Sequence, residues 1–375
     1  MPKFQEIRQQ LKAAFAERNA VIDGLLTALL AGQHVLLLGP PGTAKSLLAS
    51  KFSTAVAGGS FFQWLLTKFS SPEEIFGPIS FDGLKNDKFV RVTTNKLPES
   101  KIVFLDEIFK ANSSILNSLL TALNEGLFFN GDKVEKLPMQ LCIGASNEYP
   151  EEGLEALFDR FMFKFWIGPI ANRDSLKSLL MAGVGEVLAT LTDSELQALK
   201  DRVDAVQWGE REVDTLLNIK AALEEENMFA SDRTWVNCIK ILKATAVLED
   251  RDHVLGSDFM VLADVLWDKH EDRAKLISLI GNASDPYAAR AQAISDALKT
   301  AIREIPGLSI LTSKQVDSSE FVKRCAPVKV KLAELETMVK DLNADDNKAV
   351  KEIADRIKAT QADLTKTLRK ALDLL

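Results

Sequence analysis

The chain has 375 residues, of which 46% are hydrophobic and 26% are charged, which is the composition of a folded soluble protein of two or three domains. Its net charge of -7 argues against general attraction to nucleic acid or to anionic membranes. Three distant cysteines and three isolated histidines match neither a disulfide framework nor a metal-ligand spacing. We therefore expect a reduced, cytoplasmic protein without a cysteine or histidine metal site.

The first 30 residues are predicted to be helical. Phe4, Ile7 and Leu11 follow helical spacing with charges between them, which indicates an amphipathic helix and not a signal peptide. The most apolar early segment, 21–38, is interrupted by Asp23 and other polar residues. No run is long and apolar enough for membrane insertion, so we expect none.

Short apolar runs alternate with helical patterns up to residue 167. Five of these runs have the length and composition of buried strands: 34–39, 61–66, 101–107, 139–147 and 161–167. The segments 46–56 and 113–128 between them show helical spacing of apolar residues. This alternation predicts a three-layer α/β fold with a parallel sheet.

After residue 170 the periodicity becomes almost entirely helical. The predicted helices are 172–181, 193–206, 209–226, 231–249 and 257–267. Apolar residues at helical spacing over 332–342 and 350–368, with a polar break at 343–347, predict a helical hairpin. We expect an α/β core over 1–170, an all-α lid over 171–283 and a helical extension over 284–375.

The stretch GPPGTAKS has the features of a phosphate-binding loop. Gly39 and Gly42 let backbone N–H groups approach anionic oxygens, Lys45 faces the outer phosphates, and the Ser46 hydroxyl is a ligand for Mg²⁺. Ala44 stands where a glycine is usual, and we expect a right-handed helical conformation there, which alanine favours. The residues predicted to contact the nucleotide are Gly39, Pro40, Pro41, Gly42, Thr43, Ala44, Lys45, Ser46, Leu47 and Asp106.

A second motif, IVFLDE, is an apolar strand that ends in two carboxylates. Asp106 is expected to hold Mg²⁺, directly or through water. Glu107 is expected to orient and polarise the water that attacks the γ-phosphate of ATP. A second carboxylate suits water activation, so the pair favours an ATPase over a kinase.

With both motifs in place, the chain resembles the AAA+ ATPases, and within them the MoxR family and its RavA branch. The resemblance covers roughly residues 5–270 and is carried by GPPGTAKS, FLDEIFKANSSILNSLLTALNEGLFFNG and SDRTW. It implies a homo-oligomeric ring, usually a hexamer, with ATP between subunits. It also implies chaperone-like remodelling of a protein client, often with a partner that carries a von Willebrand factor A domain. The β-rich module of RavA has no counterpart in this sequence, so partners of that module are not transferred.

Three further residues take roles from this resemblance. Asn147, just past a predicted strand, resembles sensor 1, which positions water or contacts the γ-phosphate; the alternative is an ordinary asparagine-led turn. Arg160 resembles the arginine finger that reaches the ATP of a neighbouring subunit; the alternative is a surface pair with Asp159. Arg233 resembles sensor 2, and a nearby phosphate would explain a cation in the first turn of a helix; the alternative is an exposed arginine tolerated at small cost.

Two segments match insertions of the family. Residues 77–94 take the place of the helix-2 insert, and 128–138 contain an Asn-Gly turn that predicts a hairpin before sensor 1. We expect them to contact a client near the ring axis, with static surface hairpins as the alternative.

Two other functions stay open. A nucleic-acid-dependent motor or loader is disfavoured by the negative charge, although Lys85, Lys88 and Arg91 in the insert keep it in consideration. A nucleotide-gated scaffold with little turnover is disfavoured by the complete set of catalytic residue types. Stimulation of hydrolysis by DNA identifies the first, and turnover near background identifies the second.

Overall fold

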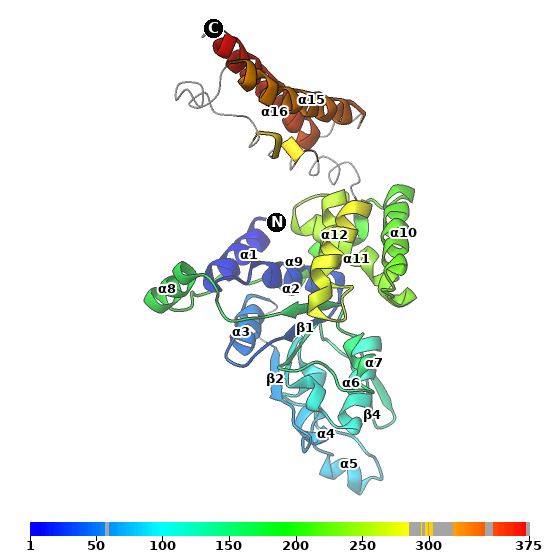
Figure 1. Ribbon diagram of the computed structural model, residues 1–375. Helices are drawn as coiled ribbons and strands as arrows, with labels where there is room; N and C mark the ends of the chain where they lie inside the picture. The colour runs from blue at the N-terminus through cyan, green and yellow to red at the C-terminus, as the bar shows by residue number, and fades with distance from the viewer. Residues whose placement is uncertain are drawn as a thin grey trace. The chain divides into compact units, whose positions relative to one another are not determined.

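The computed structural model describes residues 1–56, 60–284, 318–341 and 348–372, together with 294, 297, 298 and 300–302. The chain forms two compact units, Met1–Ile277 and Ser278–Leu375 (Figure 1). The first unit contains both predicted motifs. The second is helical wherever it is described.

A five-stranded parallel sheet forms the centre of the first unit. Its strands, in the order β2-β3-β6-β1-β7, are β1 (Val35–Leu38), β2 (Phe61–Leu65), β3 (Ile102–Asp106), β6 (Leu141–Ser146) and β7 (Phe163–Trp166). All five predicted strands are therefore confirmed, and every pairing is parallel. β1, β3 and β6 are buried along almost their whole length, because their apolar residues face the core on both sides of the sheet.

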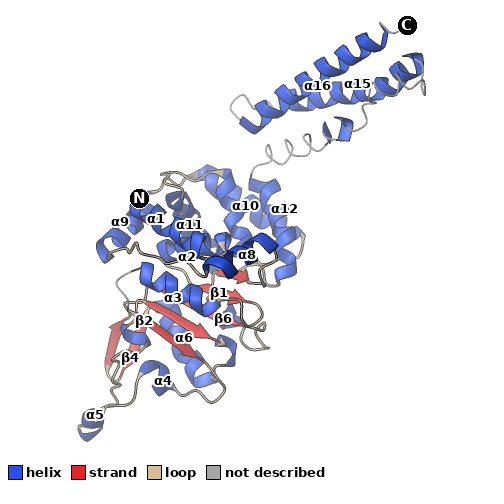
Figure 2. Cartoon of the chain, turned by 90° about the vertical axis from the view of Figure 1, so that its left-hand side faces the viewer, coloured by secondary structure: helices blue, strands red, loops and turns tan. Residues whose placement is uncertain are grey.

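Helices pack around this sheet (Figure 2). They are α1 (Pro2–Ala14), α2 (Asn19–Ala31), α3 (Lys45–Ala55), α6 (Ser113–Glu125) and α7 (Glu155–Phe158), with short 3₁₀ turns η2 (Leu97–Glu99) and η3 (Ile108–Lys110). α2 packs on β1 and β7, and α3 packs on β3. The approach of α2 is close: a Cβ added at Gly24 would lie 2.2 Å from the ring of Phe165.

The two predicted insertions lie side by side. The insertion over 77–94 follows α4 (Pro72–Phe76) and contains α5 (Phe81–Lys85). The insertion over 128–138 holds most of the antiparallel pair β4 (Leu127–Asn130) and β5 (Lys133–Lys136). Asn130 links them, because its Oδ1 accepts a hydrogen bond from Arg91 N and its Nδ2 donates to Arg91 O. Phe81, Phe89 and Phe129 remain exposed on this pair of segments.

The rest of the first unit is helical, as predicted. It contains α8 (Arg173–Ala182), α9 (Asp193–Ala205), α10 (Glu210–Glu225) and α11 (Asp232–Leu248), then the 3₁₀ segments η4 (Gly256–Asp264) and η5 (His270–Asp272), followed by the start of α12 (Arg273–Ser284), which continues past Ile277 into the second unit. The expected helix over 257–267 is the tighter 3₁₀ form, which is a correction in type and length. A capping box of Thr192 and Glu195 begins α9.

In the second unit, α15 (Ser318–Asp341) and α16 (Lys348–Leu372) pack against each other. Their buried residues form a separate apolar cluster that includes Cys325, Leu332, Leu335, Ile357 and Leu364. The predicted pair of amphipathic helices is confirmed, and the predicted turn at 343–347 lies outside the described residues. None of the described helices is long and apolar enough to cross a bilayer.

Candidate active site

The carboxyl edge of the sheet gathers the two motifs. The phosphate loop follows β1, Asp106 ends β3 and Asn147 follows β6, and these three strands are neighbours. A pocket of about 400 Å³ at this edge is lined by Pro41, Gly42, Thr43, Ala44, Lys45, Ser46, Leu47, Asp106, Glu107 and Asn147. Parallel strands place such loops at one edge, where ligands of α/β folds bind.

The ammonium group of Lys45 is held inside the loop. Its Nζ donates hydrogen bonds to Gly39 O at 2.7 Å, to Pro40 O at 3.0 Å and to Asn147 Oδ1 at 3.1 Å. These acceptors use all three ammonium protons. Burial lowers the pKa of Lys45, while the charges of Asp106 and Glu107 act against that shift. A phosphate oxygen would offer this cation a charged partner in place of neutral carbonyls.

Asp106 and Glu107 place two carboxylates beside that cation. Burial raises the pKa of Asp106, and the charge of Glu107 raises it further, although the hydrogen bond from Glu107 N and the charges of Lys45 and Lys110 oppose this. Asp106 Oδ1 accepts a hydrogen bond from Glu107 N at 3.1 Å. A carboxylate whose ionised form is poorly compensated gains from a cation. Asp106 and the Ser46 hydroxyl are oxygen donors that suit Mg²⁺ bound together with phosphate, so the residues present fit this ion.

Asn147 connects the two motifs. Its Oδ1 accepts from Lys45 Nζ, and its Nδ2 donates to Glu107 Oε1. The side chain of Glu107 is 12% exposed, so this carboxylate is largely shielded from bulk water. The predicted sensor position, the loop lysine and the second acid are therefore one hydrogen-bonded chain.

Ala44 departs from its expected conformation. Its φ of 66° and ψ of 24° are left-handed, and it is the N-cap that precedes α3, so the expectation of a right-handed helical residue was wrong. The loop must reverse direction before α3 begins at Lys45, and this turn requires positive φ. Glycine suits the position for that reason, and alanine is strained there.

We expect Ala44→Gly to raise the free energy of unfolding by about 1 kcal/mol, because glycine relieves the left-handed strain. Thermal and urea unfolding of the whole chain measure the change. Ala198→Gly, at an exposed right-handed position in α9, is the matched control and should destabilise by about 1 kcal/mol. Equal losses in both variants would contradict the strain at Ala44.

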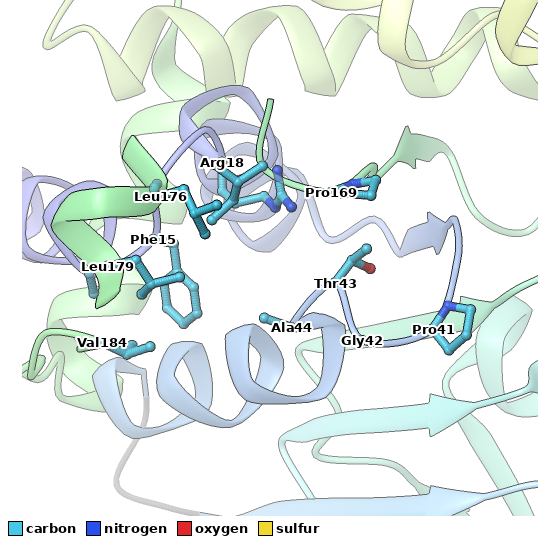
Figure 3. Close-up of a pocket in the computed structure, with 13 residues that line it drawn as sticks. Phe15, Arg18, Pro41, Gly42, Thr43, Ala44, Pro169, Leu176, Leu179 and Val184 are labelled. Carbon is cyan, nitrogen blue, oxygen red and sulfur yellow. The ribbon is translucent and has the colours of Figure 1, made fainter. Parts of the chain in front are cut away.

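A second pocket, of about 350 Å³, adjoins the other side of the phosphate loop (Figure 3). It shares Pro41, Gly42, Thr43 and Ala44 with the first pocket, and its other lining residues come from α1, the turn after it, the segment after β7, α8 and the turn that follows α8. The side chains of Phe15, Leu176 and Leu179 gather at one end of it (Figure 3). An apolar cavity beside a phosphate loop suits a heterocyclic base. The sequence analysis missed it, because its parts are distant along the chain and carry no motif.

Arg160 and Arg233 lie near the amino-terminal ends of the strands, whereas the phosphate loop lies at their carboxyl ends. β7 runs parallel to β1 with Phe163 beside Val35, so Arg160 lies before the strand starts, whereas the phosphate loop follows the strand ends. Arg160 and Arg233 line a pocket of about 360 Å³ together with Gln33, His34, Glu125, Asn237 and their neighbours. The structure brings these two arginines together but does not bring them to the phosphate loop of the same chain.

Arg160 is a partly buried cation beside a second cation. Burial lowers the pKa of Arg160, and the nearby charge of Arg233 lowers it further, while the charge of Asp159 opposes this. Arg160 Nε is buried and has no hydrogen-bond partner among the described residues. Such a donor gains from an anionic ligand or partner.

Comparison with known proteins identifies the family of the chain. Residues 2–207 match the profile of the MoxR domain in MoxR-vWA-beta-propeller ternary systems, and residues 212–280 match an AAA lid domain. The chain belongs to the MoxR family of AAA+ ATPases, as its sequence motifs predicted.

Several relatives cover most of the chain. It is 36% identical over 313 residues to uncharacterized protein MJ0079 of Methanocaldococcus jannaschii, which is 83% of this chain and 82% of that protein. It is 35% identical to MJ0812 of the same organism, over 92% of both chains. Chaperone MoxR1 of Mycobacterium tuberculosis is 26% identical over 68% of this chain and 72% of that protein. The crystal structure of a putative ATPase from Cytophaga hutchinsonii matches with a TM-score of 0.59 at 22% identity, covering 73% of this chain and 90% of that one, which shows the shared fold.

Proposed function

We propose that this chain hydrolyses ATP with Mg²⁺ at the interfaces of a homo-oligomeric ring, a hexamer, and uses the energy to remodel a protein client. One observation carries the proposal. Lys45, Asp106, Glu107 and Asn147 gather at one edge of the sheet, and Arg160 and Arg233 gather at the other. Each copy thus holds two halves of an ATPase site that face different neighbours.

The phosphate half supplies binding and water activation. Lys45 exchanges the carbonyls of its own loop for phosphate oxygens, while the apolar pocket at Phe15 and Leu179 takes the base. Ser46 and Asp106 would hold Mg²⁺, which supplies charge neutralisation on the phosphates when bound. Glu107 accepts the hydrogen bond of the attacking water, and Asn147 orients that water or the γ-phosphate.

The arginine half comes from the neighbouring copy. A four-residue strand spans about 13 Å, and Arg160 lies beyond one end of β7 while the loop lies beyond the other end of β1. This distance exceeds the reach of an arginine side chain, so Arg160 cannot complete its own site. In a head-to-tail contact, Arg160 and Arg233 approach the γ-phosphate bound by the next copy and stabilise its transition-state charge.

ATP turnover per chain tests this proposal across a wide protein concentration range. We expect specific activity to rise steeply as copies assemble, because only an interface holds both halves. Sedimentation of the same samples shows whether the rise coincides with assembly. Specific activity that is constant from monomer to oligomer would contradict a shared site.

Two observations support the proposal that the chain acts on a protein client. The matching family profile concerns systems that also contain a vWA component, so we propose a partner with a von Willebrand factor A domain. The linked insertions expose Phe81, Phe89 and Phe129, which suit an apolar protein segment and not a nucleic-acid backbone.

We further propose a cytoplasmic location, a core over 1–170, a lid over 171–283 and an extension over 284–375.

A further inference from the structure

Each oxygen of the Glu107 carboxylate interacts with a different side chain. Oε1 accepts a hydrogen bond from Asn147 Nδ2. Oε2 lies 3.2 Å from Lys110 Nζ, and apart from this ion pair it is buried without a hydrogen bond. Lys110 is therefore the group whose loss would leave this oxygen uncompensated.

The backbone aims Lys110 at Glu107. Glu107 has a left-handed conformation, with a φ of 53°, and it is the N-cap of the 3₁₀ turn η3. Lys110 N donates to Glu107 O at 2.8 Å, which closes the turn. This turn brings residues 107 and 110 together, and Lys110 Nζ meets the Glu107 carboxylate. Lys110 does not line the pocket of about 400 Å³ at the phosphate loop (the phosphate pocket), so Lys110 holds Glu107 from the side away from this pocket.

We propose that Lys110 is a positioning residue for hydrolysis: it holds Oε2 and thereby keeps Oε1 turned toward Asn147 and the phosphate pocket, where the attacking water binds. This inference rests on the proposed function, because it concerns the same site. A misplacement of about 1 Å in a reacting group can lower a rate by about 10²-fold. The side chain of Lys110 is 46% exposed and that of Glu107 is 12% exposed, and the effect of Lys110 on the position of Glu107 is expected in the rate.

The test compares Lys110→Met with Lys110→Arg in the full-length chain, with ATP as the substrate. We expect Lys110→Met to lower kcat about tenfold with KM for ATP unchanged within about twofold. Lys110→Arg keeps the cation and should restore kcat to within about threefold of wild type. Lys220→Met is the matched control, because Lys220 forms an ion pair with Glu224 on α10 and lines none of the three pockets described above. A loss that arginine does not restore, or an equal loss in the control, would overturn the inference.

Glu107→Gln, measured in parallel, separates this inference from the proposed function. If Glu107→Gln stops turnover while Lys110→Met matches wild type, the inference about Lys110 fails and the ATPase proposal stands. If wild type itself shows only background turnover, both fail. Should Lys110→Met not fold, Lys110→Gln replaces it with the same expected loss of kcat, and wild-type turnover in that variant would overturn the inference.

Discussion

Glu107→Gln is expected to lower ATP turnover at least about 100-fold while ATP binding persists. The amide keeps the size of the carboxylate but cannot accept a proton or polarise water, whereas the phosphate contacts of Lys45 are unaffected. Steady-state hydrolysis and equilibrium binding of a fluorescent ATP analogue, on the same preparation, measure the two properties. ATP affinity is expected to stay within about threefold of wild type.

The control for this variant is Glu148→Gln, which makes the same chemical change one residue from Asn147. Glu148 is exposed and does not line the phosphate pocket, so its turnover should equal that of wild type. Turnover by Glu107→Gln at even half the wild-type rate would remove Glu107 from the water-activating role. Equal losses in both variants would indicate a general effect of charge on the site.

A mixture of two inactive variants should recover activity. Arg160→Ala retains an intact phosphate half, and Glu107→Gln retains an intact arginine half. In a randomly mixed ring at equal proportions, about one quarter of the interfaces join an intact phosphate half to an intact arginine half. We therefore expect about a quarter of wild-type turnover per chain, although each variant alone is nearly inactive.

The control mixture combines Lys45→Ala with Glu107→Gln. Both changes damage the phosphate half, so no interface in that mixture is complete and no activity should return. The chains are mixed while dilute and then concentrated, so that copies exchange before the rings form. Mixed rings that regain no ATP turnover would contradict the proposal that Arg160 acts on the ATP of a neighbouring copy. Full activity of Arg160→Ala alone would contradict it as well.

Local sequence patterns were sufficient to predict most of the helices and strands. The five strands were predictable because each is a short apolar run bounded by glycine or polar residues, and the helices of the second half follow apolar spacing. The segment 257–267 was predicted as an α-helix because its apolar spacing fits one, but it forms the tighter η4. Apolar spacing marks which face is buried and does not fix the hydrogen-bond pattern of a short segment.

The sequence by itself was enough to predict the chemistry that we propose for the phosphate half. Lys45, Ser46, Asp106 and Glu107 carry it in two continuous motifs, and Asn147 follows directly after a strand, so residue order sufficed to expect them at one edge. The role of a lysine or a carboxylate in such a motif depends on the residues next to it in the sequence, which can be seen without the structure. Local sequence therefore predicted the residues that the structure gathers around the phosphate pocket.

Only the tertiary structure decided what depends on strand direction and on packing between distant segments. It assembled the apolar pocket that we propose for the base from Phe15, the loop and Leu179, and it gave Ala44 a left-handed conformation that its residue type disfavours. It also placed Arg160 and Arg233 together at the edge opposite the loop. The order and direction of the strands set these positions. The sequence did not predict them, because contacts between residues far apart in sequence leave no local pattern.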